Sequence, residues 1–163
     1  GLDVAINSRT RPEYLPEDIG FVELDALVAW CDVLVLCCPL TPETRGLLDA
    51  RRIGLMKPGA LVVNVARGLV IDDTALIAAL TEGRVGGAAL DVFATQPLPP
   101  DHPYLGFDNV IVTPHMAGIT EESMMRMGVG AAGEVLRVLA GELPLNLRNP
   151  EAVERYRERF PQK

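Results

Sequence analysis

Several residues whose side chains could do chemistry lie at or after the ends of apolar segments of this sequence. Arg67 follows one such segment, Asp91 lies at the end of the next with Gln96 in the loop after it, and His115 follows the last. A guanidinium can hold a carboxylate through two hydrogen bonds, and an imidazole can release or accept a proton near neutral pH. These residue types in one site would suit the binding of a small carboxylate and the transfer of a proton.

The elements that must position these residues alternate between short apolar runs and helical patterns. Strands are predicted at residues 3–7, 33–38, 60–65, 87–92 and 109–113, and helices at 24–30, 49–56, 72–82 and 121–140, with a short amphipathic helix in the tail. The apolar runs lack strict alternation, which is typical of strands buried on both faces. The pattern predicts an α/β fold with a parallel sheet and helices on both of its faces.

In open parallel sheets, ligands bind beyond the carboxyl ends of the strands. The polar groups that follow the predicted strands should therefore share one edge of one sheet: NSRTR at 7–11, Cys38 with Pro39, Arg67, Asp91 with Gln96, and His115. Their convergence, rather than any single residue, predicts the binding site.

Gly128, Gly130 and Gly133 spell GVGAAG, which formally matches the dinucleotide-binding pattern GxGxxG. That pattern must follow a strand and open a helix, whereas these glycines lie inside a predicted helix. Glycine inside a helix costs up to about 1 kcal/mol relative to alanine. We therefore expect these glycines to permit close helix packing rather than phosphate binding.

Charge and composition exclude several classes of partner. The net charge is −7, whereas nucleic acids and anionic membranes attract basic surfaces. The apolar runs are too short to span a bilayer. Cys31, Cys37 and Cys38 are odd in number and include an adjacent pair, which favours buried free thiols in a reducing, cytoplasmic compartment. A metal site is not expected, because the chain has no CxxC and only 2 histidines.

Motifs along most of the chain are similar to one family. They are CCPLTPETRGLLD, MKPGALVVNVARGLVID, ALIAALTEGRVGGAALDVF, QPLPPDHP and NVIVTPHMAGIT. Together they resemble the D-isomer-specific 2-hydroxyacid dehydrogenases, a family that includes glyoxylate, hydroxypyruvate and phosphoglycerate enzymes. The resemblance extends from about residue 1 to about residue 149 and says little about the substrate.

The resemblance implies a Rossmann-type sheet that lacks its first strand and its GxGxxG loop, since family members carry these before the matching region. Residues 1–143 would form a partial NAD(P)-binding domain, and residues 144–163 a tail that returns toward a substrate domain. We expect the whole enzyme to be a homodimer that transfers a hydride between NAD(P)(H) and a 2-hydroxy or 2-keto acid. We expect the chain alone to be inactive.

The resemblance also implies roles for individual residues. Arg67 would anchor the substrate carboxylate, and His115 would act as the acid/base. Asp91 would hold the nicotinamide end of the cofactor or, alternatively, hydrogen-bond the next loop. Four further positions match places where the family's backbone lies against the cofactor: Cys38, Pro39, Val65 and Gly118.

The segment NSRTR bears on the choice of cofactor. NAD-dependent enzymes place an acidic residue near this point to bind the ribose 2′-OH, whereas an arginine can accept the 2′-phosphate of NADP. Here Ser8 takes the place of the acid, with Arg9, Thr10 and Arg11 beside it. We expect NADP to be preferred over NAD, and the alternative is a pair of surface arginines with relaxed use of NAD.

Gln96 departs from the pattern of most family members, which pair a glutamate with the histidine. A carboxylate favours the imidazolium, whereas a glutamine orients the ring without adding charge. Keto-acid reduction should therefore fade at a lower pH than is usual in the family. Formate dehydrogenases also carry a glutamine–histidine pair, so formate oxidation is an alternative, although HMAGIT resembles the reductases more. A dinucleotide-sensing corepressor is a third possibility.

Overall fold

The computed structural model describes residues 1–160 and divides the chain into two compact units. The first unit is Gly1–Ala117, and the second begins at Gly118. The first, here the sheet unit, contains all the strands of the described chain. The second, here the helical unit, contains α4 and α5. The expected boundary at residue 143 between a nucleotide-binding domain and a tail stays a prediction.

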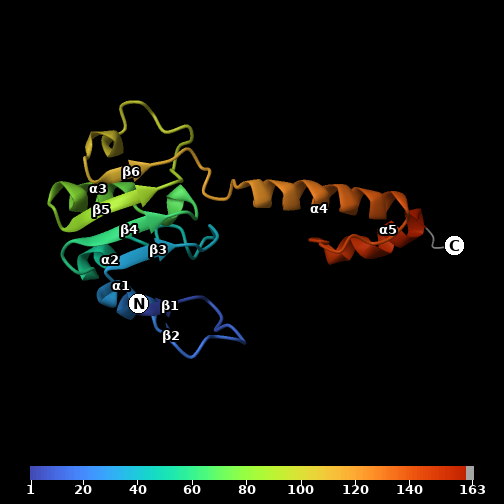
Figure 1. Ribbon diagram of the computed structural model, residues 1–163, viewed down its shortest axis with the longest axis horizontal. Coiled ribbons are helices and arrows are strands. Elements are labelled where there is room, and N and C mark those ends of the chain that lie inside the picture. The colour runs from blue at the N-terminus through green and yellow to red at the C-terminus, as the bar shows by residue number, and fades with distance from the viewer. Residues whose placement is uncertain (161–163) are drawn as a thin grey trace. The chain divides into compact units, whose positions relative to one another are not determined.

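The strands of the sheet unit form two parallel sheets (Figure 1). One consists of β1 (Val4–Ile6) and β2 (Ile19–Phe21), and the other has the order β3 (Val33–Leu36), β4 (Ala60–Asn64), β5 (Val85–Leu90), β6 (Val110–Val112). The prediction of a parallel α/β fold is therefore confirmed. The strand β2 was not predicted, because its three residues, IGF, are too few to show a pattern.

The helices of the sheet unit lie within the predicted ranges. They are α1 (Leu24–Trp30), α2 (Ala50–Leu55) and α3 (Asp73–Thr81). The side chains of Asp49 and Asp72 accept hydrogen bonds from backbone N–H groups in the first turns of α2 and α3. Gly83, with φ 67°, follows α3 in the left-handed conformation that commonly ends a helix.

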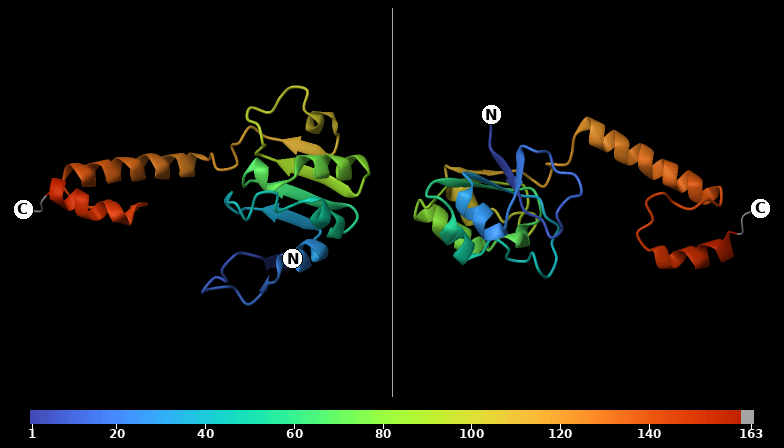
Figure 2. Two further views of the ribbon diagram at one scale, coloured as in Figure 1. Left: turned by 180° about the vertical axis from the view of Figure 1, so that it is seen from behind. Right: turned by 90° about the horizontal axis from the view of Figure 1, so that it is seen from below.

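All three of these helices lie on one face of the four-stranded sheet (Figure 2). Side chains on the covered face, such as Leu34 and Val62, are buried, whereas Val33, Val35 and Leu61 on the opposite face are exposed. Within residues 1–117, the helices expected on the second face are thus absent. Parallel sheets are nearly always covered on both faces, so this apolar face is one that other segments would cover.

The two sheets also leave unpaired strand edges. In the described chain β1 pairs with β2 alone and β3 pairs with β4 alone, so that no hydrogen-bonded ladder joins β1 to β3. Such an edge presents backbone N–H and C=O groups that can pair with a further strand.

Arg84 ties the end of α2 to the start of β5. Its guanidinium donates hydrogen bonds to the carbonyl oxygens of Ile53, Gly54 and Met56. These carbonyls are among the groups that the end of a helix leaves without partners. Arg84 therefore stabilises the side of the sheet unit opposite to the carboxyl ends of the strands.

The helical unit consists of α4 (Glu121–Leu139), the 3-10 turn η3 (Pro150–Ala152) and α5 (Val153–Arg159). Thr120 and Ser123 form a capping box at the start of α4. The hydroxyl of Tyr156 in α5 donates to the carbonyl oxygen of Glu142 at 2.6 Å and lies 3.4 Å from that of Val138, which holds α5 near the end of α4.

The glycines of GVGAAG lie inside α4, as predicted, so they do not form a dinucleotide-binding loop. A Cβ added at Gly128, Gly130 or Gly133 would meet nothing within 4 Å. Their expected role in close helix packing therefore stays a prediction.

The three cysteines are free, as expected, but they are not all buried. Only Cys31 is buried, whereas Cys38 is partly buried and Cys37 is exposed. The expectation of three buried thiols is wrong for Cys37, because this residue comes just beyond the end of β3 and not inside the covered sheet. Among residues 1–160, no helix is long and apolar enough to cross a membrane.

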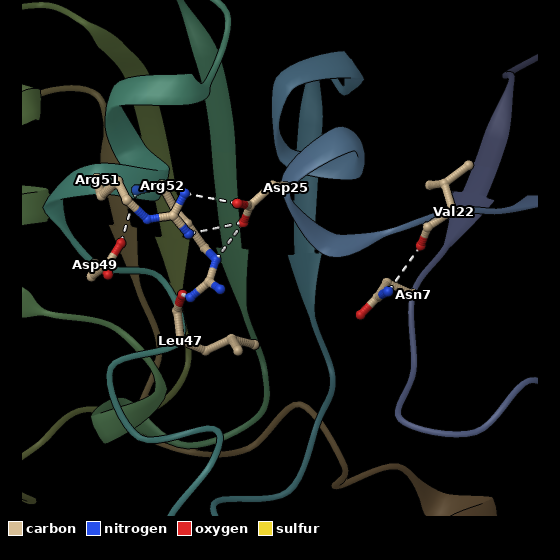
Figure 3. A network of polar contacts seen from close by, with 7 residues as sticks. All are labelled: Asn7, Val22, Asp25, Leu47, Asp49, Arg51 and Arg52. Atoms are coloured by element: carbon tan, nitrogen blue, oxygen red, sulfur yellow. Dashed lines mark hydrogen bonds and ion pairs between the residues drawn. The ribbon is translucent and has the colours of Figure 1, made fainter.

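A charged network joins α1 to α2 (Figure 3). The carboxylate of Asp25 accepts two hydrogen bonds from Arg51, at 2.7 and 3.0 Å, and one from the Nε of Arg52, at 2.9 Å. The hydrogen bonds from Arg51 and then from Arg52 lower the pKa of Asp25 from 3.8 to about 2. In the same view Asn7 donates to the carbonyl of Val22 at 2.8 Å, which holds the end of β1 beside β2.

Replacement of Asp25 by asparagine should lower the melting temperature at neutral pH. Because the pKa of Asp25 is lower in the folded chain than in the unfolded chain, its carboxylate stabilises the fold. This contribution to stability is complete above pH 3.8 and is lost as the pH falls through about 2. The melting temperatures of Asp25→Asn and wild type should therefore become equal near pH 2, and should also approach each other in high salt. Asp32→Asn, which removes a single exposed contact to Lys57, is the matched control and should change the melting temperature less. A difference between Asp25→Asn and wild type that does not change with pH would contradict this account.

Candidate functional site

The carboxyl ends of β3 and β4 form one wall of the candidate site. An open hollow of about 420 Å³ lies there, lined by residues that follow the two strands: Cys37, Cys38, Pro39, Leu40, Val65, Ala66 and Arg67. The structure thus brings together four of the predicted site residues, namely Cys38, Pro39, Val65 and Arg67. Burial raises the pKa of the Cys38 thiol, so this residue contributes a neutral, apolar surface.

The turn that carries Arg67 is closed by a buried side chain, Asn64, at the end of β4. Asn64 is 1% exposed. Its Oδ1 accepts a hydrogen bond from the N–H of Ala66 at 3.0 Å, and its Nδ2 donates to the carbonyl of Arg67 at 3.1 Å. The guanidinium of Arg67 donates from Nη1 to the carbonyl of Ala66 at 2.6 Å. This contact uses one of the five N–H donors of a guanidinium, which is compatible with binding a carboxylate through others.

Gly68 brings the Arg67 turn into contact with the segment that leads to Gln96. A Cβ on Gly68 would lie 1.9 Å from the backbone carbon of Phe93 and 2.3 Å from the nitrogen of Ala94. Only glycine therefore permits this approach of two backbones. As a result, the turn after β4 and the loop after β5 are packed directly against each other.

His115 and Gln96 form the side-chain pair that the sequence predicts. The Nδ1 of His115 lies 3.1 Å from the Oε1 of Gln96. Because an amide oxygen can only accept, Nδ1 carries the proton of this hydrogen bond. The second ring nitrogen, Nε2, is then left to exchange a proton with a bound molecule. His102, by contrast, anchors its own loop, since its Nδ1 accepts from the N–H of Tyr104 at 3.3 Å.

The backbone at His115 has an unusual conformation. Its φ is 57°, and among residues 1–160 it is the only non-glycine residue with a positive φ. Such a conformation costs on the order of 1–3 kcal/mol and persists where the surroundings hold it. The N–H of His115 donates to the carbonyl of Thr113 at 3.0 Å, which closes a tight turn.

Asp91 holds the same turn from the end of β5. This side chain is 4% exposed and accepts hydrogen bonds from the Thr113 hydroxyl at 2.6 Å, the Met116 N–H at 2.8 Å and the Ala117 N–H at 2.9 Å. Burial alone would raise the pKa of Asp91, but these hydrogen bonds outweigh it and hold the pKa below its usual value. The structure thus shows a hydrogen-bonding role for Asp91, but its partners lie in the turn after β6 and not in the loop that directly follows Asp91. Its contact with the nicotinamide stays a prediction.

The predicted cofactor residues Ser8, Arg9 and Thr10 lie in an exposed turn after β1. The hydroxyl of Ser8 donates to the carbonyl of Thr10 at 2.7 Å. The guanidinium of Arg11 lies 5.4 Å from the ring centre of Phe21. The expectation that this turn shares one sheet edge with the other site residues is wrong, because β1 pairs with β2 in a separate sheet.

Gly118 is the first residue of the helical unit. Its carbonyl accepts a hydrogen bond from the hydroxyl of Ser123 at 2.6 Å, which belongs to the start of α4. Its predicted contact with the cofactor stays a prediction.

Sequence reasoning missed two residues that shape this site. Asn64 stands at the end of a predicted strand, where a polar residue in an apolar run is a signal that it has a specific hydrogen-bonding role. Gly68 follows Arg67 directly, but its role depends on a contact with residues 93–94, which are distant in sequence. No group of three or more His, Cys, Asp or Glu side chains that could hold a metal occurs in the part of the chain that the structure describes.

Comparison with known proteins identifies relatives of the chain. It is 43% identical over 148 residues to a protein named glyoxylate reductase from Thermofilum pendens, a match that covers 91% of this chain and 44% of the relative. A glyoxylate/hydroxypyruvate reductase B from Pectobacterium carotovorum is 40% identical over 131 residues, covering 80% of this chain and 41% of the relative. The chain thus spans less than half the length of these two curated relatives.

A solved structure and a family description agree with these relatives. A D-isomer specific 2-hydroxyacid dehydrogenase from Xanthobacter autotrophicus, in complex with NADPH and MES, matches with a TM-score of 0.77 and 42% identity, covering 93% of this chain and 62% of that one. The family described as D-isomer specific 2-hydroxyacid dehydrogenase, NAD binding domain, matches residues 1–117, the same residues that form the sheet unit. The chain therefore belongs to the D-isomer-specific 2-hydroxyacid dehydrogenase family, and its sheet unit corresponds to the NAD-binding domain of that family.

Proposed function

We propose that this chain is part of an oxidoreductase that transfers a hydride between NAD(P)(H) and a small 2-hydroxy or 2-keto acid. Glyoxylate and hydroxypyruvate are the substrates of the proposal, since relatives of the chain are named for them. The observation that carries the proposal is the hydrogen-bonded pair of His115 and Gln96, 3.1 Å apart, in the same unit as Arg67. This pair supplies an oriented proton donor, and the arginine supplies a partner for a carboxylate.

In the proposed reduction, each side chain has one task. Bound NAD(P)H supplies the hydride that adds to the carbonyl carbon of the keto acid. The guanidinium of Arg67 binds the carboxylate of the substrate and fixes the direction of its carbonyl group. The Nε2 of His115 donates a proton to the carbonyl oxygen, so the product is the neutral hydroxyl of a 2-hydroxy acid. Gln96 keeps the ring of His115 in the required orientation through Nδ1.

The position and the lining of the hollow support the binding of part of a dinucleotide there. Cys38, Pro39 and Val65 give it a wall of small and apolar groups at the carboxyl ends of β3 and β4. Open parallel sheets bind nucleotides at this edge. We propose that the backbone at Cys38, Pro39, Val65 and Gly118 lies against the cofactor, and that Asp91 lies near its nicotinamide end.

The two sheets support the proposal that the nucleotide domain is completed by a further segment. A parallel strand between β1 and β3 would satisfy both unpaired edges and join the sheets. Crossovers between parallel strands are right-handed, so a connection from this strand to β1 would run on the face opposite to α2 and α3. A helix in that connection would lie on the same face of the joined sheet as Val33 and Val35, which are exposed. In this proposal, residues 1–143 contribute the rest of the domain.

The homodimer and the cytoplasmic location belong to the same proposal. The location is supported by the three free cysteines, which are typical of proteins in a reducing compartment.

Formate oxidation is a second candidate, favoured by the uncharged partner of His115. Oxidation of formate gives up a hydride and releases CO₂ without a proton transfer, so it has no need of a carboxylate beside the histidine. The observed amide–imidazole pair of Gln96 and His115 would suit that reaction.

Turnover assays on the complete enzyme distinguish these functions. We expect NADPH or NADH to be oxidised in the presence of glyoxylate and of hydroxypyruvate. His115→Ala should lower kcat by a factor of about 100 or more, because it removes the proton donor. Arg67→Ala should mainly raise KM for the keto acid, because it removes a charged hydrogen-bonding partner.

Other results of the same assays would replace the proposal. Turnover of formate alone would establish the second candidate. Nucleotide binding without turnover of any of these acids would favour a corepressor-like sensor.

Arg9 should determine the preference for NADP. Its side chain is exposed in the turn after β1, and its charge contributes, after the hydroxyl of Thr41 and a backbone hydrogen bond, to lowering the pKa of Glu43. Arg9→Ala should lower kcat/KM for NADPH by a factor of about 10 to 100, and that for NADH much less, because one charge-assisted contact with the 2′-phosphate is lost. Arg11→Ala is the control, since the guanidinium of Arg11 lies over Phe21. Wild-type kinetics that favour NADH would refute this assignment.

Gln96→Glu should move the pH dependence of keto-acid reduction. A carboxylate at residue 96 favours the protonated imidazole of His115, and reduction requires that protonated form. The pH above which reduction fades should therefore rise in Gln96→Glu, as measured by kcat/KM over a range of pH. Gln96→Ala should lower the rate without an upward move of this limit, because it removes the orienting hydrogen bond and adds no charge. An unchanged limit in Gln96→Glu would show that the pair does not control the proton.

A further inference from the structure

We propose that Asn64 and Asp91 are positioning residues, which set the turns that carry Arg67 and His115 and so fix these two side chains relative to each other. This inference rests on the proposed function for the roles of Arg67 and His115. Among residues 1–160, Asn64 and Asp91 are the two buried polar or charged side chains, at 1% and 4% exposed. Buried polar groups are retained where their hydrogen bonds are satisfied, and here all the side-chain partners belong to the two turns, at residues 66–67 and 113–117.

Asp91 acts on the backbone that follows His115. Its Oδ1 accepts from the Thr113 hydroxyl and the Met116 N–H, and its Oδ2 accepts from the Ala117 N–H. These donors lie within two residues of His115 on either side, so the carboxylate holds both sides of the residue with φ 57°. Without these acceptors, the turn would lose the contacts that hold His115 in a conformation that L residues rarely adopt.

Asn64 acts on the backbone before and at Arg67. Its amide group accepts from Ala66 N–H and donates to the Arg67 carbonyl, so one side chain fixes both ends of a short turn. The turn is extended at Arg67, with φ −147° and ψ 146°, and the chain then enters the 3-10 turn η1 (Gly68–Val70). The direction in which the guanidinium leaves the backbone is therefore set by Asn64.

The hydrogen bonds made by Asn64 and those made by Asp91 are linked through the ends of the strands. The N–H of Asp91 donates to the carbonyl of Asn64 at 3.0 Å, and the N–H of Thr113 donates to the carbonyl of Leu90 at 3.0 Å. The last hydrogen bonds between β4 and β5 and between β5 and β6 are thus made at or next to Asn64 and Asp91, the residues that hold the turns. The close approach of Gly68 to residues 93–94 adds a second link between the same segments.

The first experiment measures amide hydrogen exchange, which does not depend on catalysis. Asp91→Asn should speed exchange at Met116 and Ala117 by about tenfold or more, because an amide replaces a charged acceptor. Ala66 should change little in that variant. Asn64→Leu, which has similar volume and no polar atoms, should speed exchange at Ala66 and leave Met116 and Ala117 nearly unchanged. Uniform acceleration over the sheet unit, or none, would overturn the proposal.

Milder variants serve where these fail to fold. Thr113→Val removes one of the donors to Asp91 and leaves the carboxylate charge in place. It should speed exchange at Met116 and Ala117 by a smaller factor than Asp91→Asn. Asn64→Asp removes the donor to the Arg67 carbonyl and keeps an acceptor for Ala66, so it should change catalysis in the same direction as Asn64→Leu.

The second experiment is a pair of double-mutant cycles on the complete enzyme. Asp91→Asn should lower kcat by about tenfold or more in the wild-type background and by less than about twofold in His115→Ala, because it acts through the histidine. Asn64→Leu should raise KM for the keto acid by about tenfold, and should have little effect in Arg67→Ala. Arg84→Ala is the structural control, expected to lower the melting temperature and to leave kcat and KM nearly unchanged.

The outcomes separate this inference from the proposed function. Additive effects in both cycles, or a raised KM for the cofactor that persists in Asp91→Asn on the His115→Ala background, would overturn positioning as the role of these residues. If the wild-type enzyme turns over no 2-keto acid, the proposed function fails. The exchange measurements then still decide whether Asn64 and Asp91 set the two turns.

Discussion

The carboxylate of Asp91 is the group on which the geometry of the candidate site depends most. It is buried at the end of β5 and yet stays charged, because hydrogen bonds from the following turn hold its pKa below its usual value. A buried charge is stable in a protein only when such partners compensate for the loss of water. The fold thus ties the stability of this charge to one conformation of the turn at His115. The same bonds that make the carboxylate tolerable also direct the imidazole.

The parallel sheet explains why such bonds can form at this edge. Successive parallel strands end side by side, and the connections that follow them start from neighbouring points. Asn64 pairs with Leu90, and Leu90 pairs with Val112, so three strand ends lie in one row. Each turn then needs only a short side chain from its own strand or from the neighbouring strand to hold it. Polar side chains of Asn and Asp have the length and the acceptors for this task.

Local signals in the sequence predicted much of the fold. The helices predicted at 49–56, 72–82 and 121–140 are present, because their starts depend on local contacts: Asp49, Asp72 and Thr120 cap them within one turn. The bare second face of the sheet was not predicted, because apolar strands look the same whether or not a second layer covers them. The strand β2 escaped detection for the opposite reason, since it is held by its pairing with β1 and not by a pattern of its own.

Residue types and their order along the chain predicted part of the site. The pairing of His115 with Gln96 was predicted from motifs and is present. Asp91 also has a hydrogen-bonding role, although with the turn after β6 and not with the loop that directly follows it. The positive φ of His115 and the contact made at Gly68 could not be predicted, because each results from segments that meet only after folding.

The contact at Gly68 also limits how this site can be redesigned. The backbones of the arginine turn and of the loop after β5 touch where a Cβ would lie 1.9 Å from Phe93. A loop transplanted from another member of the family at residues 93–96 would therefore have to match the backbone path at Gly68 as well as its own ends. The arginine turn and the loop after β5 would therefore have to be exchanged together. A library that changes the backbone of only one of these two segments would mostly contain chains in which the two backbones clash.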